Sequence, residues 1–248
     1  MRAIVAYPGD FWILVGSTVL VQASGLIFLW AIFRRIPTIN GWDFWQVGLM
    51  YALVYVAEGV TSLFFNGLWA LTGMVNRGEF DRLLVRPYSV LAQVMSSNIG
   101  VNGLGNVVLG GAMTGIALAH LDVAWDAGRV LLAIALLVGA VGVKVGLTIA
   151  SNASGFWIPG PYSLFALSIH QVGELARYPL TIYSTLIRGL LTFVLPFAFM
   201  SYFPVSALLG VGEHPWLGYL TPLVAVWTIW VGVWLTRRGL RRYESAGN

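Results

Sequence analysis

The stretch RVLLAIALLVGAVGVKVGLTIAS occupies residues 129–151, and after its first residue it carries one charged side chain, Lys144. An apolar run of this length spans the hydrocarbon core of a bilayer as a helix. Similar apolar stretches lie near residues 11–33, 46–70, 99–120, 156–176, 187–209 and 216–236. The sequence therefore predicts an all-α polytopic membrane protein.

The composition of the whole chain agrees with this class of protein. Of its 248 residues, 58% are apolar and 10% are Asp, Glu, Lys or Arg. A soluble domain carries about 25% charged residues, so lipid is expected to cover most of this surface. The net charge of +4 comes mostly from arginines at the ends of the apolar stretches, where they orient membrane spans rather than bind nucleic acid. Cysteine is absent, which excludes disulfides and thiolate metal sites.

The first apolar run, residues 11–33, is interpreted as a transmembrane helix that stays in the mature protein. It is longer than the apolar region of a signal peptide, and no small-x-small cleavage site follows it.

Arginine placement predicts the topology. Four arginines follow the last apolar stretch, and three more lie in the longest polar segment, residues 74–98, so both are expected on the cytoplasmic side. An even number of spans must then separate them, whereas five apolar stretches lie between. The stretch 187–209 contains Pro196 and Pro204, which suit a re-entrant helix pair within 178–210 better than a straight span. Six spans remain, with both termini cytoplasmic, at about 11–33, 46–70, 99–120, 129–151, 156–176 and 216–236. The pair Arg34 and Arg35 on the outer side runs against this rule.

Motifs for catalysis are missing from the sequence. A P-loop needs a glycine loop that ends in Gly-Lys-Ser/Thr, whereas the single lysine lies in GAVGVKV, residues 139–145, inside an apolar stretch. We therefore expect no enzymatic activity and no bound cofactor. His170 and Glu174 share a helix face, but such a lone pair is more often structural than metal-binding, so no metal site is predicted.

The segment RGEFDRLLVRP, residues 77–87, combines charges with a small apolar ridge. This pattern predicts a short amphipathic helix that ends at Pro87, with a second helix from Ser89. Such a helix could dock on a partner protein or lie on lipid headgroups. The candidate docking residues are Arg77, Glu79, Phe80, Asp81, Arg82, Leu83, Leu84 and Arg86.

Glu58 and Lys144 are the ionisable residues deepest inside predicted spans. Charges at this depth are costly unless they are partnered, and both residues lie roughly 20 Å from the outer edge at 1.5 Å per residue. An ion pair is one interpretation. The alternatives are a protonated Glu58 and a Lys144 that extends toward the inner surface.

Other polar and small residues repeat with helical spacing. Tyr51, Tyr55, Glu58 and Ser62 share one face of the second span, which could line a transport path or pack between helices. Asn98, Asn102 and Asn106 form a similar stripe on the third span, where interhelical hydrogen bonding is expected. The motifs at Gly111/Gly115 and Gly142/Gly146 predict close helix packing. Lipid contact is expected for Trp227, Trp230 and Trp234.

Two groups of residues carry a family resemblance. The first is the 77–87 segment preceded by GWDF at 41–44, and the second is ELARYPLTIY at 174–183, continued by LTFVLPFAF at 191–199 and ALLG at 207–210. In this order, and with six spans, they resemble the membrane permease subunits of type 2 ABC transporters, in the small six-span, drug- or lipid-exporter-like bacterial branch. The resemblance covers nearly the whole chain from about residue 11.

The resemblance implies a multisubunit transporter in the bacterial plasma membrane. It implies a second permease, the same or a sister chain, and two copies of a separate ATP-binding subunit that holds ATP and Mg. A coupling helix at Arg77–Arg86 would contact that subunit, and 178–210 would form re-entrant helices on the outer face. The family usually has an amphipathic helix before the first span. Only about ten residues precede it here, so either contact with the ATPase is reduced or the chain begins further upstream.

The combined expectation is the permease subunit of an ABC exporter for an amphipathic or apolar substrate. Two alternatives stay open: an ion-coupled secondary transporter that uses Glu58, and a membrane scaffold subunit that transports nothing.

Overall fold

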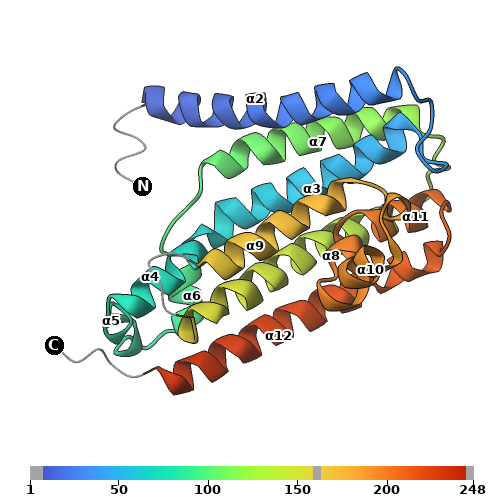
Figure 1. Ribbon diagram of the computed structural model, residues 1–248. Helices are drawn as coiled ribbons and strands as arrows, with labels where there is room; N and C mark the ends of the chain where they lie inside the picture. The colour runs from blue at the N-terminus through green and yellow to red at the C-terminus, as the bar shows by residue number, and fades with distance from the viewer. Residues whose placement is uncertain (1–7, 159–162, 244–248) are drawn as a thin grey trace.

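The computed structural model describes residues 8–158 and 163–243, which form a bundle of long helices (Figure 1). The main helices are α2 (Pro8–Phe33), α3 (Phe44–Phe65), α7 (Asn102–His120), α8 (Ala127–Asn152) and α12 (Thr221–Arg242). Within the described ranges, five helical stretches are long and apolar enough to cross a membrane, namely Trp12–Phe33, Phe44–Asn76, Asn102–His120, Ala127–Phe156 and Pro215–Arg242. The predicted all-α polytopic fold is confirmed.

Local capping fixes where the central helices begin. The Asp43 carboxylate accepts hydrogen bonds from the backbone N–H groups of Trp45 and Gln46, and the Gln46 side chain accepts one from the Asp43 N–H, which completes a capping box at α3. Asp126 accepts from the Arg129 N–H at the start of α8. Both caps lie in the short polar loops that interrupt the apolar runs, so the apolar runs become continuous helices.

The predicted span at 156–176 has a different beginning in the structure. Its first residue ends η2 (Ala153–Phe156), which continues from α8, and residues 159–162 lie outside the described ranges. The helix itself is α9 (Leu164–Gly173), followed by η3 (Glu174–Arg177), and it is shorter than the helices that meet the length criterion. The six-span count therefore stays a prediction.

The segment predicted to be re-entrant is a chain of short helices. These are η4 (Leu180–Ile182), α10 (Thr185–Gly189), η5 (Leu190–Val194), η6 (Phe197–Met200) and α11 (Tyr202–Leu209). The chain leaves helical geometry at Leu195–Pro196, and Pro204 stands in the first turn of α11, where proline is tolerated. Gly210 ends α11 with φ of +70°, a conformation that favours glycine. In Figure 1 these helices gather at one end of the bundle, with η7 (Pro215–Leu220) leading into α12.

The polar segment 74–98 lies at the other end of the bundle, which we call the coupling end (Figure 1). It follows η1 (Asn66–Ala70) and α4 (Leu71–Asn76) and contains α5 (Asp81–Leu84) and α6 (Val90–Met95). The described start of α2 and the last turn of α12 lie at this same end, as the predicted topology requires. Which side of a membrane this end faces remains a prediction.

A separate hydrophobic core attaches the coupling end to the bundle. Phe80 is its centre, with 0% exposure, and its ring lies 5.4 Å from that of Phe156 and 5.6 Å from that of Tyr243. The other fully or nearly buried members are Leu68, Leu71, Val94, Val145 and Ile149. Phe80, which the sequence placed on the docking ridge, is therefore an internal anchor: the amphipathic pattern identified an apolar side chain but not the surface that covers it.

Glycines set the closest helix contacts. A Cβ on Gly146 would lie 2.5 Å from the backbone nitrogen of Ile229, so only glycine permits this approach of α8 to α12. A Cβ on Gly103 would similarly lie 2.5 Å from the Gly59 carbonyl oxygen, between α7 and α3. A Cβ on Gly111 or Gly115 would meet nothing within 4 Å among the described residues, so this motif makes no close packing within the chain. The Gly142/Gly146 prediction is confirmed.

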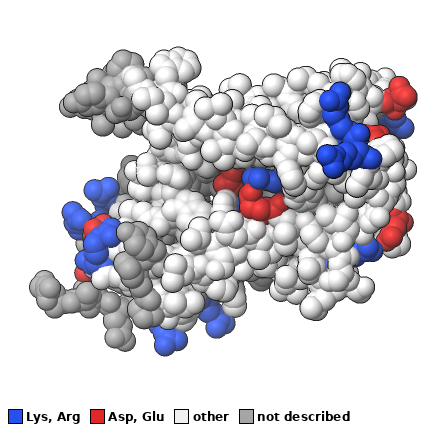
Figure 2. Space-filling view, turned by 45° about the horizontal axis from the view of Figure 1, so that its top comes forward, with Lys and Arg blue, Asp and Glu red and all other residues white. Residues whose placement is uncertain are grey.

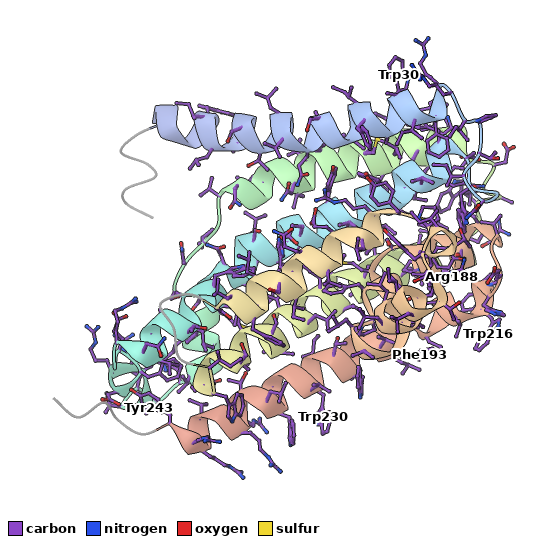
Figure 3. The ribbon with its side chains drawn as sticks, in the orientation of Figure 1. Trp30, Arg188, Phe193, Trp216, Trp230 and Tyr243 are labelled. Atoms are coloured by element: carbon purple, nitrogen blue, oxygen red, sulfur yellow. The ribbon has the colours of Figure 1, made fainter. Side chains whose placement is uncertain are left out.

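Aromatic side chains mark the outer surface of α12. Trp227, Trp230 and Trp234 are all exposed, as expected for lipid contact, and the Arg238 guanidinium lies 4.8 Å from the Trp234 ring centre. Figure 3 shows Trp230 pointing away from the bundle, with Tyr243 near the coupling end and Trp216 at the opposite end. These exposed rings suit a helix face in contact with lipid.

We predict that Gly146→Val destabilises the protein because the added side chain cannot fit between α8 and α12. Overpacking of this kind costs about 1–3 kcal/mol, which should appear as a lower apparent melting temperature of the detergent-solubilised chain. Gly115→Val is the matched control, since its Cβ meets nothing within 4 Å. An equal loss in both variants would contradict the α8–α12 contact.

Candidate functional site

An ion pair joins the two central helices inside the bundle. The Lys144 Nζ on α8 lies 2.5 Å from the Glu58 Oε2 on α3. The side chains are 5% and 16% exposed, respectively. Of the three interpretations left open for Glu58 and Lys144, the structure shows the ion pair. The pair lowers the free-energy cost of burying two charged side chains in an apolar bundle, because each charge neutralises the other.

His170 on α9 completes this cluster. Its Nδ1 lies 3.1 Å from Lys144 Nζ and 3.9 Å from Glu58 Oε2. An ammonium group has only donors, so Lys144 donates to Nδ1, and Nδ1 must be the unprotonated nitrogen. The contact joins α9 to α3 and α8. Sequence reasoning paired His170 only with Glu174 on its own helix, because nothing local indicates which helix faces the ring.

A second ion pair lies on η3, one turn further along the chain. Glu174 and Arg177 form a salt bridge, and the guanidinium carbon of Arg177 lies 5.0 Å from the Tyr55 ring centre and 5.9 Å from that of Tyr51. Both tyrosines are buried, and the Tyr55 hydroxyl donates to the backbone oxygen of Gln22 at 3.1 Å. Of the two roles open for the tyrosines, the structure supports packing between helices.

A polar cavity of about 420 Å³ lies beside these pairs. It includes Glu58, Ser62, Asn102 and Asn106, which the sequence had singled out as polar residues inside the spans, but not Tyr51, Tyr55 or Lys144. The remaining lining residues come from α2 and from the α9–η3 segment: Ser17, Thr18, Val21, Gln22, His170, Gln171, Glu174 and Arg177. Figure 2 shows acidic and basic side chains next to each other in a central hollow, with uncharged surface around it and the other charged side chains toward the two ends of the face.

A hydrogen bond connects the two helices, α2 and α7, that line one side of the cavity. Gln22 Nε2 on α2 donates to Asn106 Oδ1 on α7 at 3.0 Å, which confirms the interhelical role expected for Asn106. Asn102 also lines the cavity, whereas Asn98 precedes α7 and is exposed. Because α2 is largely exposed along its length, few contacts hold this wall of the cavity.

The coupling end offers a different kind of surface. Val85 is 83% exposed and stands with exposed Arg82, Leu84, Arg86 and Tyr88. Gln93 fixes this loop by donating to the backbone oxygens of Leu83 at 3.1 Å and Tyr88 at 3.0 Å. The sequence prediction contained neither Val85 nor Tyr88, since exposure of an apolar residue is not visible in a short amphipathic pattern.

The charged residues at the start of this segment pair with each other. Arg77 Nε lies 2.6 Å from Glu79 Oε1, and this hydrogen bond lowers the pKa of the Glu79 carboxyl and raises that of Arg77. Leu83 and Asp81 are partly buried. The outward-facing part of the predicted docking set is therefore Arg77, Arg82, Leu84 and Arg86.

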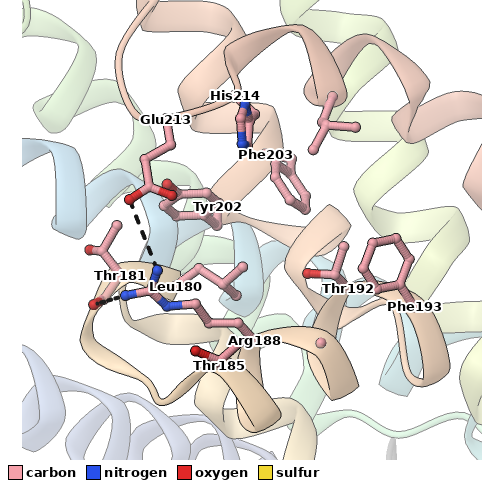
Figure 4. A pocket seen from close by; sticks show the side chains of 12 residues that line it. Leu180, Thr181, Thr185, Arg188, Thr192, Phe193, Tyr202, Phe203, Glu213 and His214 are labelled. Carbon is pink, nitrogen blue, oxygen red and sulfur yellow. Dashed lines mark hydrogen bonds and ion pairs between the residues drawn. The ribbon is translucent and has the colours of Figure 1, made fainter.

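A second cavity, of about 260 Å³, lies at the end opposite the coupling end, among α10, α11 and the loop before η7 (Figure 4). Arg188 donates to the backbone oxygens of Thr181 at 2.6 Å and Tyr183 at 2.9 Å, and it lies 3.9 Å from the Glu213 carboxylate. Its guanidinium thus ties the short helices together. No residue predicted for a site lies here.

We predict that breaking the buried ion pair on one side is more damaging than removing both charges. Glu58→Gln or Lys144→Met leaves an uncompensated buried charge, a change that costs about 3–5 kcal/mol. The double variant should recover much of the loss in melting temperature. Arg77→Met at the exposed Arg77–Glu79 pair is the control and should leave the melting temperature unchanged. Additive losses in the double variant would show that the two side chains do not stabilise each other.

Among the described residues, no group of three or more His, Asp or Glu could hold a metal ion.

Comparison with known proteins agrees with this architecture. No curated protein and no solved structure matches the chain. A family model described as ABC-2 family transporter protein matches residues 19–247. In that family ATP hydrolysis normally resides in a separate subunit, and the chain matched here is the multi-pass membrane part. The chain therefore belongs to the ABC-2 family of transporter proteins and is a membrane permease subunit of an ABC transporter.

Proposed function

We propose that this permease is part of an exporter that moves an amphipathic or apolar substrate across the bacterial plasma membrane. Two copies of a separate ATP-binding subunit, which hold ATP and Mg, would act on two permeases, either identical or sister chains. The permease itself would bind no nucleotide, in agreement with the missing P-loop.

The observation that carries this proposal is the core around Phe80. It joins the coupling end to α8 through Val145 and Ile149, and to the continuation of α3 through Leu68 and Leu71. Lys144 precedes Val145 directly, and Glu58 lies on α3 itself. A force applied to the exposed coupling residues would therefore reach both helices that line or support the polar cavity.

The exposed residues of the coupling end supply a surface for the ATP-binding subunit. Leu84 and Val85 offer apolar contact area, and Arg82 and Arg86 beside them provide charges at its rim. This composition suits a small protein interface with an apolar centre. In an assembly that exports its substrate, the cavity beside Glu58 would be part of the path.

An ion-coupled secondary transporter is the second candidate. The buried cluster of Glu58, Lys144 and His170 favours it, because such groups in membrane proteins often carry protons. It gives no role to the exposed coupling surface. Transport that is abolished by a proton uncoupler but insensitive to ATP depletion would support this candidate over ours.

We predict that the double variant Leu84→Asp/Val85→Asp loses its ATP-binding subunit on affinity purification from a strain that expresses both genes. Excluding one buried aliphatic side chain is worth about 1.5–3 kcal/mol, so at least about a tenfold loss in affinity is expected. The melting temperature of the permease should not change, since both side chains are exposed. Trp125→Asp, in the loop at the opposite end, is the control. Undiminished co-purification of the double variant would refute docking at this surface.

A further inference from the structure

We propose that the polar cavity between α2, α3, α7 and α9 binds the ammonium group of an amphipathic amine. This inference rests on the proposed function, since it names the substrate class of that transport path. It follows from which charges the cavity presents, which hydrogen-bonding atoms remain available around them, and where the cavity opens.

In both ion pairs the carboxylate is the more exposed partner. Glu58 is 16% exposed and Lys144 5%, while Glu174 is 29% exposed and Arg177 18%. Lys144 is not part of the cavity lining, whereas both carboxylates are. Two carboxylates and one guanidinium, that of Arg177, therefore line the cavity, so its lining carries a net negative charge although the two pairs together are neutral.

The Arg177 cation is further occupied by its surroundings. Its guanidinium is paired with Glu174 and lies 5.0 Å from the centre of the buried Tyr55 ring, whose negative face attracts it. An anionic ligand would have to displace Glu174, because the guanidinium nitrogen that has no hydrogen-bond partner, Nε, is buried. An added ammonium group can instead share the carboxylates without breaking either pair.

The α2 wall presents oxygen acceptors. The hydroxyls of Ser17 and Thr18 each donate to the Leu14 backbone oxygen at 2.9 Å, so their oxygens face the cavity as acceptors. Gln22 uses its amide nitrogen for Asn106, which leaves its Oε1 to accept. A primary ammonium has three donors and no acceptor, so it complements this wall and the two carboxylates.

The position of Val21 places the apolar part of the ligand. Val21 lines the cavity and is 68% exposed, so the opening reaches the outer face of α2. That helix is apolar, and 6% of the residues in its most apolar stretch are buried. An alkyl or aromatic tail can therefore lie against α2 in the lipid while the ammonium stays in the cavity.

The test uses the full-length chain, co-purified with its ATP-binding subunit, in nanodiscs of zwitterionic lipid. The probe is a dansylated alkylamine, compared with its N-acetylated form, which has the same tail but no charge, and with the matching carboxylate. Fluorescence titration is corrected for empty nanodiscs. We expect the free amine to bind about tenfold or more tightly than the acetylated form, as one charge-assisted contact permits.

The variant Glu174→Gln should bring this preference close to one, whereas Glu213→Gln, at the opposite end, should keep it. If Glu174→Gln fails to fold, the relative affinities of the wild-type chain for the three probes still test whether the cavity prefers an ammonium group. Equal binding of amine and acetylated amine, or tighter binding of the carboxylate, would overturn the inference. If the wild-type chain binds its ATP-binding subunit but shows no preference for the amine, only the substrate class is overturned. If the wild-type chain prefers the amine but recruits no ATP-binding subunit, only the proposed function is overturned.

Discussion

Two opposite charges inside an apolar helix bundle must find each other, and the centre of this fold depends on that constraint. Glu58 and Lys144 lie on separate helices with apolar neighbours, and the 2.5 Å contact between them ties α3 to α8. The third member, His170, accepts from the same ammonium and so positions α9. Once α9 is in place, η3 brings Glu174 and Arg177 against the tyrosines of α3. The polar cavity forms because these groups need polar or water-accessible surroundings on their remaining side.

The rest of the bundle connects this centre to the coupling end. Phe80 is an apolar side chain in an otherwise polar segment. Its burial against Phe156 and Tyr243 attaches this segment to the rest of the bundle. The same core includes Val145 and Ile149 of α8. The helix α8 therefore carries both a part of the core around Phe80 and the lysine of the buried pair. A transporter that is driven from outside its own chain needs such a shared element, because energy applied at one end has to change the site at the other.

The sequence identified residues whose own burial is costly, such as charged side chains inside a span. It could not identify contacts that depend on which distant segment packs against a residue. Depth singled out Glu58 and Lys144, since an unpartnered charge is costly at that level, but it left the ion pair as one of three interpretations until the structure placed the two side chains in contact. The burial of Phe80 could not follow from the amphipathic pattern, which is the same for an internal anchor and an external ridge. The Gly111/Gly115 motif makes no close contact within the chain for a related reason: spacing shows that two glycines share a face, but it is Gly103 and Gly110 that pack against α3. The start of α9 was also misplaced, because an apolar run does not reveal that η2 continues from the preceding helix.

The geometry of the pairs also constrains how a permease of this kind can respond to its motor. The Glu58–Lys144 contact is already at 2.5 Å, so a movement of α8 away from α3 that exceeds what the two side chains can follow would lengthen it. Because Lys144 is almost fully covered, it would remain out of the cavity while Glu58 loses part of its neutralisation. The cavity would then become more negative, and its affinity for a cation would rise. Movement in the opposite sense, which restores the pair, would weaken that affinity. A motor that shifts α8 through the Phe80 core could thus alternate between holding and releasing a cationic ligand with a displacement no larger than that needed to break one ion pair.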